Sequence, residues 1–133
     1  MITTGVDITD LAPFARMLAQ HGERFLNRIY TEREQEQCAG RVALLACTFA
    51  AKEGVAKALG TGLNYMAPTG VDLREMEILA DPSIGSATLS LSGAAQSRAL
   101  ALGIHDWSIC VAHSRDYALA MVLAFGSAEE NEV

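Results

Sequence analysis

An acid and a base stand one helical turn apart in the middle of the chain. Glu53 and Lys57 are four positions apart, and the run that holds them ends in a glycine turn at 60–62. Upstream apolar residues recur with a helical period and define one stripe facing a core: Val42, Leu45, Phe49 and Ala56. Glu53 falls in that stripe. A buried carboxylate is costly unless a cation or a metal compensates it, so we expect Glu53 to have a partner.

One interpretation of this pair is purely structural, because an exposed Glu53–Lys57 pair on a helix contributes only about 0.3–0.5 kcal/mol. A second acid favours a site. Asp7 lies between Val6 and Ile8 in a β-branched stretch, so in a strand it faces away from both. Mg²⁺ is held by one or two carboxylates together with water and phosphate oxygens. A glycine turn offers backbone N–H groups to a phosphate at close approach. Two carboxylates, a lysine and a glycine turn therefore suit Mg²⁺ and a phosphate group.

Four segments occur in a characteristic order and spacing: Gly5 to Ile8, Arg24 to Glu34, Phe49 to Gly62, and Val111 to Ser114. With them, residues 4–125 of the chain resemble the holo-acyl-carrier-protein synthases, the short single-unit 4′-phosphopantetheinyl transferases. The run Lys-Glu-x-x-x-Lys-x-x-Gly-Thr-Gly is the specific part of the resemblance. Gly-Val-Asp alone would be a weak signal.

The resemblance implies transfer of the 4′-phosphopantetheine group from coenzyme A (CoA) to a serine of an apo acyl carrier protein or carrier domain, with release of 3′,5′-ADP. It implies that Asp7 and Glu53 hold Mg²⁺ and that Lys57 completes the catalytic set. The residues that it places against CoA are Lys52, Lys57, Gly60, Thr61, Gly62, His113 and Ser114. The serine proton would pass to Glu53 or to a metal-bound water, and the sequence leaves that choice open.

His113 ends an alternating apolar stretch, so its pattern alone indicates a half-buried histidine at a strand end. In the family, the matching histidine belongs to the CoA-binding surface and comes from a neighbouring subunit. The resemblance therefore implies a homotrimer with an active site between each pair of subunits, because a ring repeats one heterologous interface until it closes.

A net charge of −6 and a pI near 4.9 argue against nucleic acid as the main partner. Acyl carrier proteins are acidic, so a docking face on this chain must be a local basic patch. The resemblance implies that Arg16, Arg24 and Arg28 form it, and Arg24 and Arg28 would share a face if their segment is helical. The alternative is an ordinary solvated charged surface.

Three positions depart from related transferases. Thr9 stands where two-lobed relatives have a third acid, Thr48 replaces a common arginine, and Pro13 replaces a frequent basic residue. Two other functions therefore stay open. One is a catalytically weakened homologue that binds CoA or a carrier protein without efficient transfer. The other is a structural oligomer in which the Glu53–Lys57 pair serves only an interface.

Composition indicates one compact domain. The chain has 133 residues, half of them apolar, and no apolar run long enough to span a membrane. Its N-terminus lacks the basic and apolar regions of a secretion signal. The cysteines are odd in number and scattered: Cys38, Cys47 and Cys110. They predict no zinc site and suit a reducing cytoplasm.

We expect an α+β fold of the phosphopantetheinyl transferase type, with an antiparallel sheet packed on a long helix in a domain of residues 1–126. An acidic, disordered tail, 127–133, would follow. The expected helices span 10–20, 31–38, 41–59 and 92–103. The expected strands span 2–9, 73–80, 86–91, 107–113 and 117–125. Asp10 and Ser92 should open helices, and Thr31 and Glu34 should form a capping box.

Overall fold

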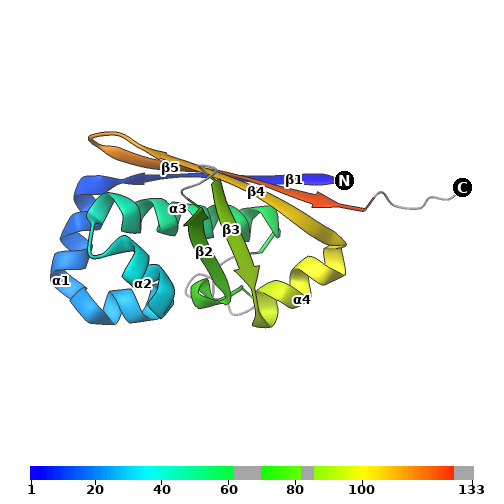
Figure 1. Ribbon diagram of the computed structural model, residues 1–133, viewed down its shortest axis with the longest axis horizontal. Helices are drawn as coiled ribbons and strands as arrows, with labels where there is room; N and C mark the ends of the chain where they lie inside the picture. Colours follow the sequence, from blue (N-terminus) through cyan, green and yellow to red (C-terminus); the bar gives the residue numbers. More distant parts are fainter. Residues whose placement is uncertain (62–69, 82–85, 128–133) are drawn as a thin grey trace, which may run out of the picture.

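The computed structural model describes residues 1–61, 70–81 and 86–127, and it shows the expected α+β fold (Figure 1). Its elements, in chain order, are β1 (Ile2–Asp10), α1 (Leu11–Ile29), α2 (Glu32–Cys38), α3 (Val42–Ala58), the 3₁₀ turn η1 (Leu73–Glu75), β2 (Met76–Asp81), β3 (Ser86–Leu91), α4 (Gly93–Leu102), β4 (Ile104–His113) and β5 (Tyr117–Gly126). An antiparallel sheet of order β1-β5-β4 covers α3, and β2 pairs with β3 in a separate hairpin. The proposed tail from residue 128 onward lies outside the described residues.

The long helix α3 is buried around most of its circumference, although Lys57 in its last turn is exposed. The sheet lies on one face of it, and α1, α2 and β2 pack against the rest. Residues that point in all directions around the helix are therefore buried, including Ala46, Ala50, Lys52 and Val55. The prediction of a helix with a single apolar stripe is wrong. Large side chains lie along that stripe, but small side chains such as Ala46 and Ala50 are buried as well, so the buried surface extends around most of the helix.

Backbone contact between β1 and α3 depends on two glycines. A Cβ atom on Gly5 would collide with the backbone carbonyl of Gly54, and one on Gly54 would stand 2.8 Å from Cγ2 of Val122. The side chains of β5 that face α3 are correspondingly small, with Ala118 and Ala120 fully buried. This close approach brings the side chains of β1 directly against the C-terminal half of α3.

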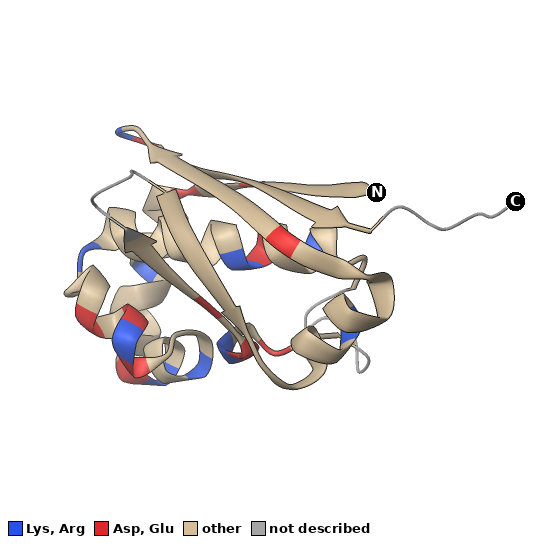
Figure 2. Ribbon diagram, turned by 45° about the vertical axis from the view of Figure 1, so that its right-hand side comes forward, with Lys and Arg blue, Asp and Glu red and all other residues tan. Residues whose placement is uncertain are grey.

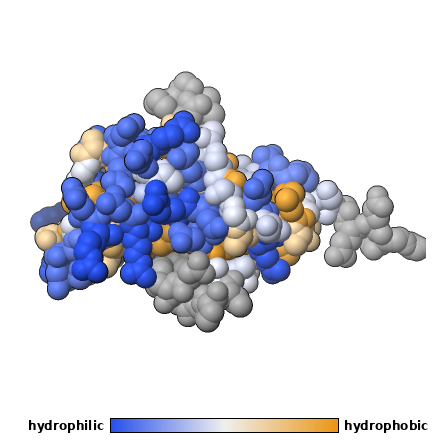
Figure 3. Space-filling view, turned by 90° about the horizontal axis from the view of Figure 1, so that it is seen from below, coloured by the Kyte–Doolittle hydropathy of each residue, from blue (hydrophilic) through white to orange (hydrophobic). Residues whose placement is uncertain are grey.

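The other face of the sheet carries large apolar side chains. Ile8 is 63% exposed and Met121 is 49% exposed, and Val6 and Leu119 accompany them. Across the strands, Val6, Met121 and Cys110 form one row. Charged residues are sparse along these strands in Figure 2, whereas the side of the molecule opposite the sheet is mostly hydrophilic in Figure 3. An exposed apolar face of this kind indicates an interaction surface.

The first helix is longer than the expected 10–20. Gly22 adopts φ 52° and ψ −128°, which interrupts the helical backbone, but the chain resumes the helix to Ile29. Phe25, Leu26 and Ile29 pack on the core, and that burial continues the helix past a residue that usually ends one. Arg24 and Arg28 therefore lie in a helical segment.

The chain does not enter β2 as a strand at residue 73. Asp72 caps η1 by accepting a hydrogen bond from the Arg74 N–H at 2.9 Å, and the strand begins only at Met76. Glu75 then caps α4 by accepting from the Ala94 N–H at 2.7 Å, whereas Ser92 at the predicted N-cap position makes no side-chain bond. Asp10 makes none either.

The last hairpin begins earlier than expected, since β4 starts at Ile104 with an irregular register before Asp106. The capping box at Thr31 and Glu34 is confirmed. Within the described ranges, none of the helices combines the length and hydropathy needed to cross a bilayer.

Candidate active site

Asp7 from β1 and Glu53 from α3 line one hollow of about 350 Å³. The first turns of α1 form its rim with Pro13, Phe14 and Met17. The rest of the lining comes from Phe49 of α3 and from the end of β1, residues 8–10. The structure thus brings together two carboxylates that are 46 positions apart in the sequence. Because the wall beside them is apolar, charges in this hollow interact more strongly than they would in open water.

Lys57 joins the last turn of α3 to β1. Its Nζ donates to Oδ1 of Asp7 at 3.0 Å and to the Val6 carbonyl at 2.9 Å. The Asp7 side chain is only 13% exposed, whereas that of Lys57 is 53% exposed. Thr9 donates to the other Asp7 oxygen at 3.4 Å. Lys57 therefore compensates the Asp7 carboxylate, yet it is exposed enough to move to another anion.

The donor set of this hollow suits a hard divalent cation. Carboxylate oxygens are what Mg²⁺ prefers, and it commonly keeps several waters and takes its remaining ligands from substrate phosphates. No group of three or more potential metal-binding side chains occurs among the described residues. Asp7 and Glu53 could therefore hold Mg²⁺ only as part of a shell that water and a phosphorylated ligand complete.

The glycine turn after α3 ends that helix. Gly60 has φ 70°, and its N–H donates to the Lys57 carbonyl, while the Thr61 N–H donates to the Ala56 carbonyl. This pair of bonds is the Schellman arrangement that ends a helix. The backbone N–H groups of Gly60 and Thr61 are thus engaged by α3, and the prediction that these two residues lie against CoA stays a prediction. Gly62 lies outside the described residues.

Lys52 is fully buried, which contradicts the prediction that its ammonium lies against CoA. Its Nζ lies 2.7 Å from Oε1 of Glu34 and donates to the Leu73 carbonyl at 2.7 Å. Glu34 also accepts from the Thr31 and Ile78 N–H groups. Burial lowers the pKa of Lys52, and the Glu34 carboxylate opposes that shift. Sequence reasoning assigned Glu34 only a capping role and missed this pair.

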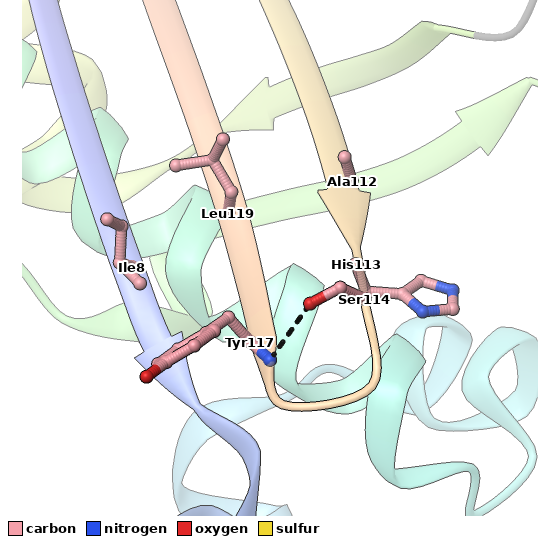
Figure 4. A pocket seen from close by; sticks show the side chains of 6 residues that line it. All are labelled: Ile8, Ala112, His113, Ser114, Tyr117 and Leu119. Atoms are coloured by element: carbon pink, nitrogen blue, oxygen red, sulfur yellow. Dashed lines mark hydrogen bonds between the residues drawn. The ribbon is translucent and has the colours of Figure 1, made fainter.

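His113 and Ser114 lie away from the two carboxylates within one chain. They line a shallow hollow on the outer face of the sheet with Ile8, Tyr117 and Leu119, and the Ser114 hydroxyl accepts from the Tyr117 N–H at 3.4 Å (Figure 4). The His113 imidazole projects from the β4 edge of the sheet, with β5 between it and β1. One subunit therefore does not bring His113 into the Asp7–Glu53 hollow.

The three predicted docking arginines are exposed on α1. Arg16 precedes the Gly22 kink, and Arg24 and Arg28 follow it. Arg28 lines a second hollow of about 350 Å³ with an apolar lining, and Met17 and Phe49 belong to both this hollow and the carboxylate hollow. Arg28 is thus connected to the carboxylate hollow through the apolar side chains that the two hollows share.

The chain matches the model of the 4′-phosphopantetheinyl transferase superfamily over residues 3–122. It belongs to that family. It is 41% identical over 128 residues to a holo-[acyl-carrier-protein] synthase from Herpetosiphon aurantiacus, covering 95% of this chain and all of the relative.

Solved structures of such synthases resemble this transferase. The one from Neisseria meningitidis has a TM-score of 0.79 at 31% identity, covering 94% of this chain and 99% of the other. A Chronobacterium ammoniagenes synthase in complex with CoA has a TM-score of 0.79 at 26% identity, covering 96% and 99%.

Two departures from related transferases have clear positions in this family member. Thr48, which replaces a common arginine, is 8% exposed, and its hydroxyl donates to the Leu44 carbonyl at 2.9 Å. Its side chain is therefore largely buried, although it lines a small hollow together with Cys38 and Val111. Pro13 lies on the rim of the carboxylate hollow, so its replacement of a basic residue removes a charge beside that hollow.

Proposed function

We propose that this transferase moves the 4′-phosphopantetheine group of CoA onto a serine of an apo acyl carrier protein or carrier domain at the hollow between Asp7 and Glu53. The observation that carries the proposal is the meeting of these two carboxylates in one hollow, with Lys57 bonded to Asp7. The products would be holo carrier protein and 3′,5′-ADP.

The acidic residues and the lysine of the hollow would have different roles in the transfer. Asp7 and Glu53 would hold Mg²⁺, which would supply the positive charge that polarises the phosphoryl oxygens of CoA and offsets charge on the leaving group. Lys57 is half exposed and would turn from Asp7 to the same phosphates. Phosphoryl transfer needs alignment and neutralised charge more than covalent help. Glu53 or a water beside it would accept the serine proton.

A homotrimer would complete the site. The row Val6–Met121–Cys110 lies at the centre of an exposed apolar sheet face, which supports self-association through that face. His113 lies at the far edge of the same sheet, and one chain does not bring it to Glu53. A neighbouring subunit would supply His113 and Ser114 to the CoA cleft, as the closure of a ring allows.

The carrier protein would dock on α1. Arg16, Arg24 and Arg28 offer exposed positive charge on a chain of net charge −6, and the hollow beside Arg28 continues to the carboxylates. Exposed charges are screened beyond about 8–10 Å at physiological salt. Carrier binding should therefore weaken as salt rises. The free thiols of all three cysteines support the proposal that the protein works in the reducing cytoplasm.

Incubation of an apo acyl carrier protein with the enzyme, CoA and Mg²⁺ tests the proposal by intact-mass spectrometry. The carrier should gain the mass of one phosphopantetheine group, and chelation of divalent ions should stop the gain. The burial of Thr48 favours one alternative, a weakened homologue that binds CoA without efficient transfer. CoA binding by calorimetry without any mass gain on the carrier would support that alternative and contradict transfer.

A further inference from the structure

Thr9 lies beside Asp7 in the carboxylate hollow. The two residues are two positions apart in β1, so their side chains lie on the same face of the strand. The Thr9 Oγ1 donates to Oδ2 of Asp7 at 3.4 Å, while the Lys57 Nζ donates to Oδ1 at 3.0 Å. Thr9 and Lys57 therefore hold different oxygens of one carboxylate.

The side chains opposite this pair on β5 cannot compete for its hydrogen bonds. Ala118 lies opposite Thr9 and Ala120 lies opposite Asp7, and both alanines are fully buried. A threonine side chain has restricted rotation about its first torsion, because two heavy atoms branch from its Cβ. The strand thus holds the Thr9 hydroxyl on one side of the Asp7 carboxylate.

The two groups that hold Asp7 would respond differently to a cation. Lys57 is positively charged and 53% exposed, so it would leave Asp7 when a divalent ion binds there. The Thr9 hydroxyl is neutral and short, so it would keep its place beside Oδ2. A distance of 3.4 Å is long for an O–H···O bond, and hydrogen bonds at unliganded sites commonly tighten when the ligand binds.

We propose that Thr9 is a positioning residue, which holds Oδ2 of Asp7 so that Oδ1 is available to a divalent ion once Lys57 has left. This inference rests on the proposed function, which assigns Mg²⁺ to Asp7 and Glu53. Carboxylates that bind metals usually accept hydrogen bonds from neighbouring groups, which fix their orientation. Thr9 stands where two-lobed relatives have a third acid. A hydroxyl at this position would orient the first acid and add no charge of its own.

Binding of Mn²⁺, a paramagnetic substitute for Mg²⁺, to the assembled protein without CoA tests this role by electron paramagnetic resonance. Thr9→Val keeps the branched side chain but removes the hydroxyl, so Mn²⁺ affinity should fall about 10–100-fold. Thr9→Ser keeps the hydroxyl and should retain most of the affinity. Thr3→Val is the matched control, because Thr3 lies on the same face of β1 but donates to the Ala58 carbonyl at 2.8 Å. This variant should bind Mn²⁺ as the unaltered protein does.

A further comparison shows whether Thr9 acts on Asp7 or through Lys57. In Lys57→Met no lysine competes for Asp7, yet the addition of Thr9→Val should still lower Mn²⁺ affinity by a similar factor. A loss that disappears in this background would overturn the proposal, because Thr9 would then act through the lysine.

Unchanged Mn²⁺ affinity in Thr9→Val would also overturn the proposal. Equal losses in Thr9→Val and Thr3→Val would do the same, since the loss of any hydrogen bond from β1 would then have this effect. Failure of the proposed function would look different. Mn²⁺ binding that depends on Thr9, without any transfer to a carrier, would contradict the function and leave the role of Thr9 standing.

Discussion

The ammonium of Lys57 lies 3.0 Å from a carboxylate oxygen of Asp7, so an ion pair joins the last turn of α3 to β1. This pair keeps the negative charge of Asp7 compensated when no substrate is present. A phosphate that enters the hollow would compete with Asp7 for Lys57, and Mg²⁺ would compete with Lys57 for Asp7. The exchange of partners couples substrate binding to the arrangement of the site.

Replacement of Lys57 by methionine should therefore have two separate effects. Transfer should slow by about 10²–10³-fold, the usual loss when one charge-stabilising donor is removed. Affinity for Mn²⁺, a paramagnetic substitute for Mg²⁺, should rise in the absence of CoA because Asp7 loses its competing cation. Electron paramagnetic resonance would measure the metal affinity. Lys57→Arg should retain part of the activity, and transfer at the normal rate by Lys57→Met would contradict the role of the pair.

The buried pair of Lys52 and Glu34 should be a major contributor to stability. Lys52→Met leaves the Glu34 carboxylate buried without its cation, which should lower the free energy of unfolding by about 3–5 kcal/mol. The double variant Lys52→Met/Glu34→Gln removes both charges and should recover much of that loss. Urea denaturation of the single and double variants would measure both effects. If Lys52→Met keeps full stability but loses CoA affinity, the residue is a ligand-binding group after all.

The sequence motif contained both Lys52 and Glu53. It did not show that Lys52 is buried whereas Glu53 lines the hollow. Adjacent residues on a helix point about 100° apart, so one faces the core while the other reaches the hollow. The direction of each depends on contacts far away in the sequence. Gly5 against Gly54 and Lys52 against Glu34 are such contacts. Glu34 was visible only as the capping partner of Thr31, because a capping box is a local signal.

Most of the secondary structure followed from local signals, and the errors have the same long-range origin. The first helix was expected to end at residue 20, but packing of Phe25 and Ile29 on the core carries it further. Gly60 was correctly placed as the end of α3. The sequence pattern did not show that the Gly60 N–H group donates to the Lys57 carbonyl, because that bond depends on the positions of the carbonyl groups at the end of α3.

Self-association should depend on the apolar sheet face. Met121→Glu places a charge at the centre of the row Val6–Met121–Cys110, so the assembly should dissociate. Sedimentation velocity should give a trimer for the unaltered protein and a monomer for Met121→Glu. Cys110 is exposed in the single chain and should react with a thiol reagent faster in the variant. A monomeric, fully active unaltered protein would contradict the trimer.

The two buried thiols should make the protein less stable at alkaline pH. Burial raises the pKa of Cys38 and of Cys47, so the unfolded chain loses these protons at lower pH than the folded chain does. Their stabilising contribution is complete below about pH 8.5 and falls as pH rises through the raised pKa values. Burial lowers the pKa of Lys52, so this residue makes stability rise with pH instead. Its contribution is the same in every variant compared.

Unfolding free energies measured from pH 7 to 10 would show this effect of the thiols. Cys38→Ala/Cys47→Ala should decline less steeply than the unaltered protein, and Cys110→Ala should decline as steeply as the unaltered protein does. An identical slope for the double variant would mean that other groups cause the decline.

The most direct measurement compares three acids that line the same hollow, Asp7, Glu53 and Asp10. Each is changed to its amide, and the mass of an apo acyl carrier protein is followed during incubation with CoA and Mg²⁺. The amides keep the shape of the side chains and remove their charge. Asp7→Asn and Glu53→Gln should add no phosphopantetheine group to the carrier, whereas Asp10→Asn should modify it fully. Full modification by Glu53→Gln or by Asp7→Asn would contradict the assignment of this hollow as the site of transfer.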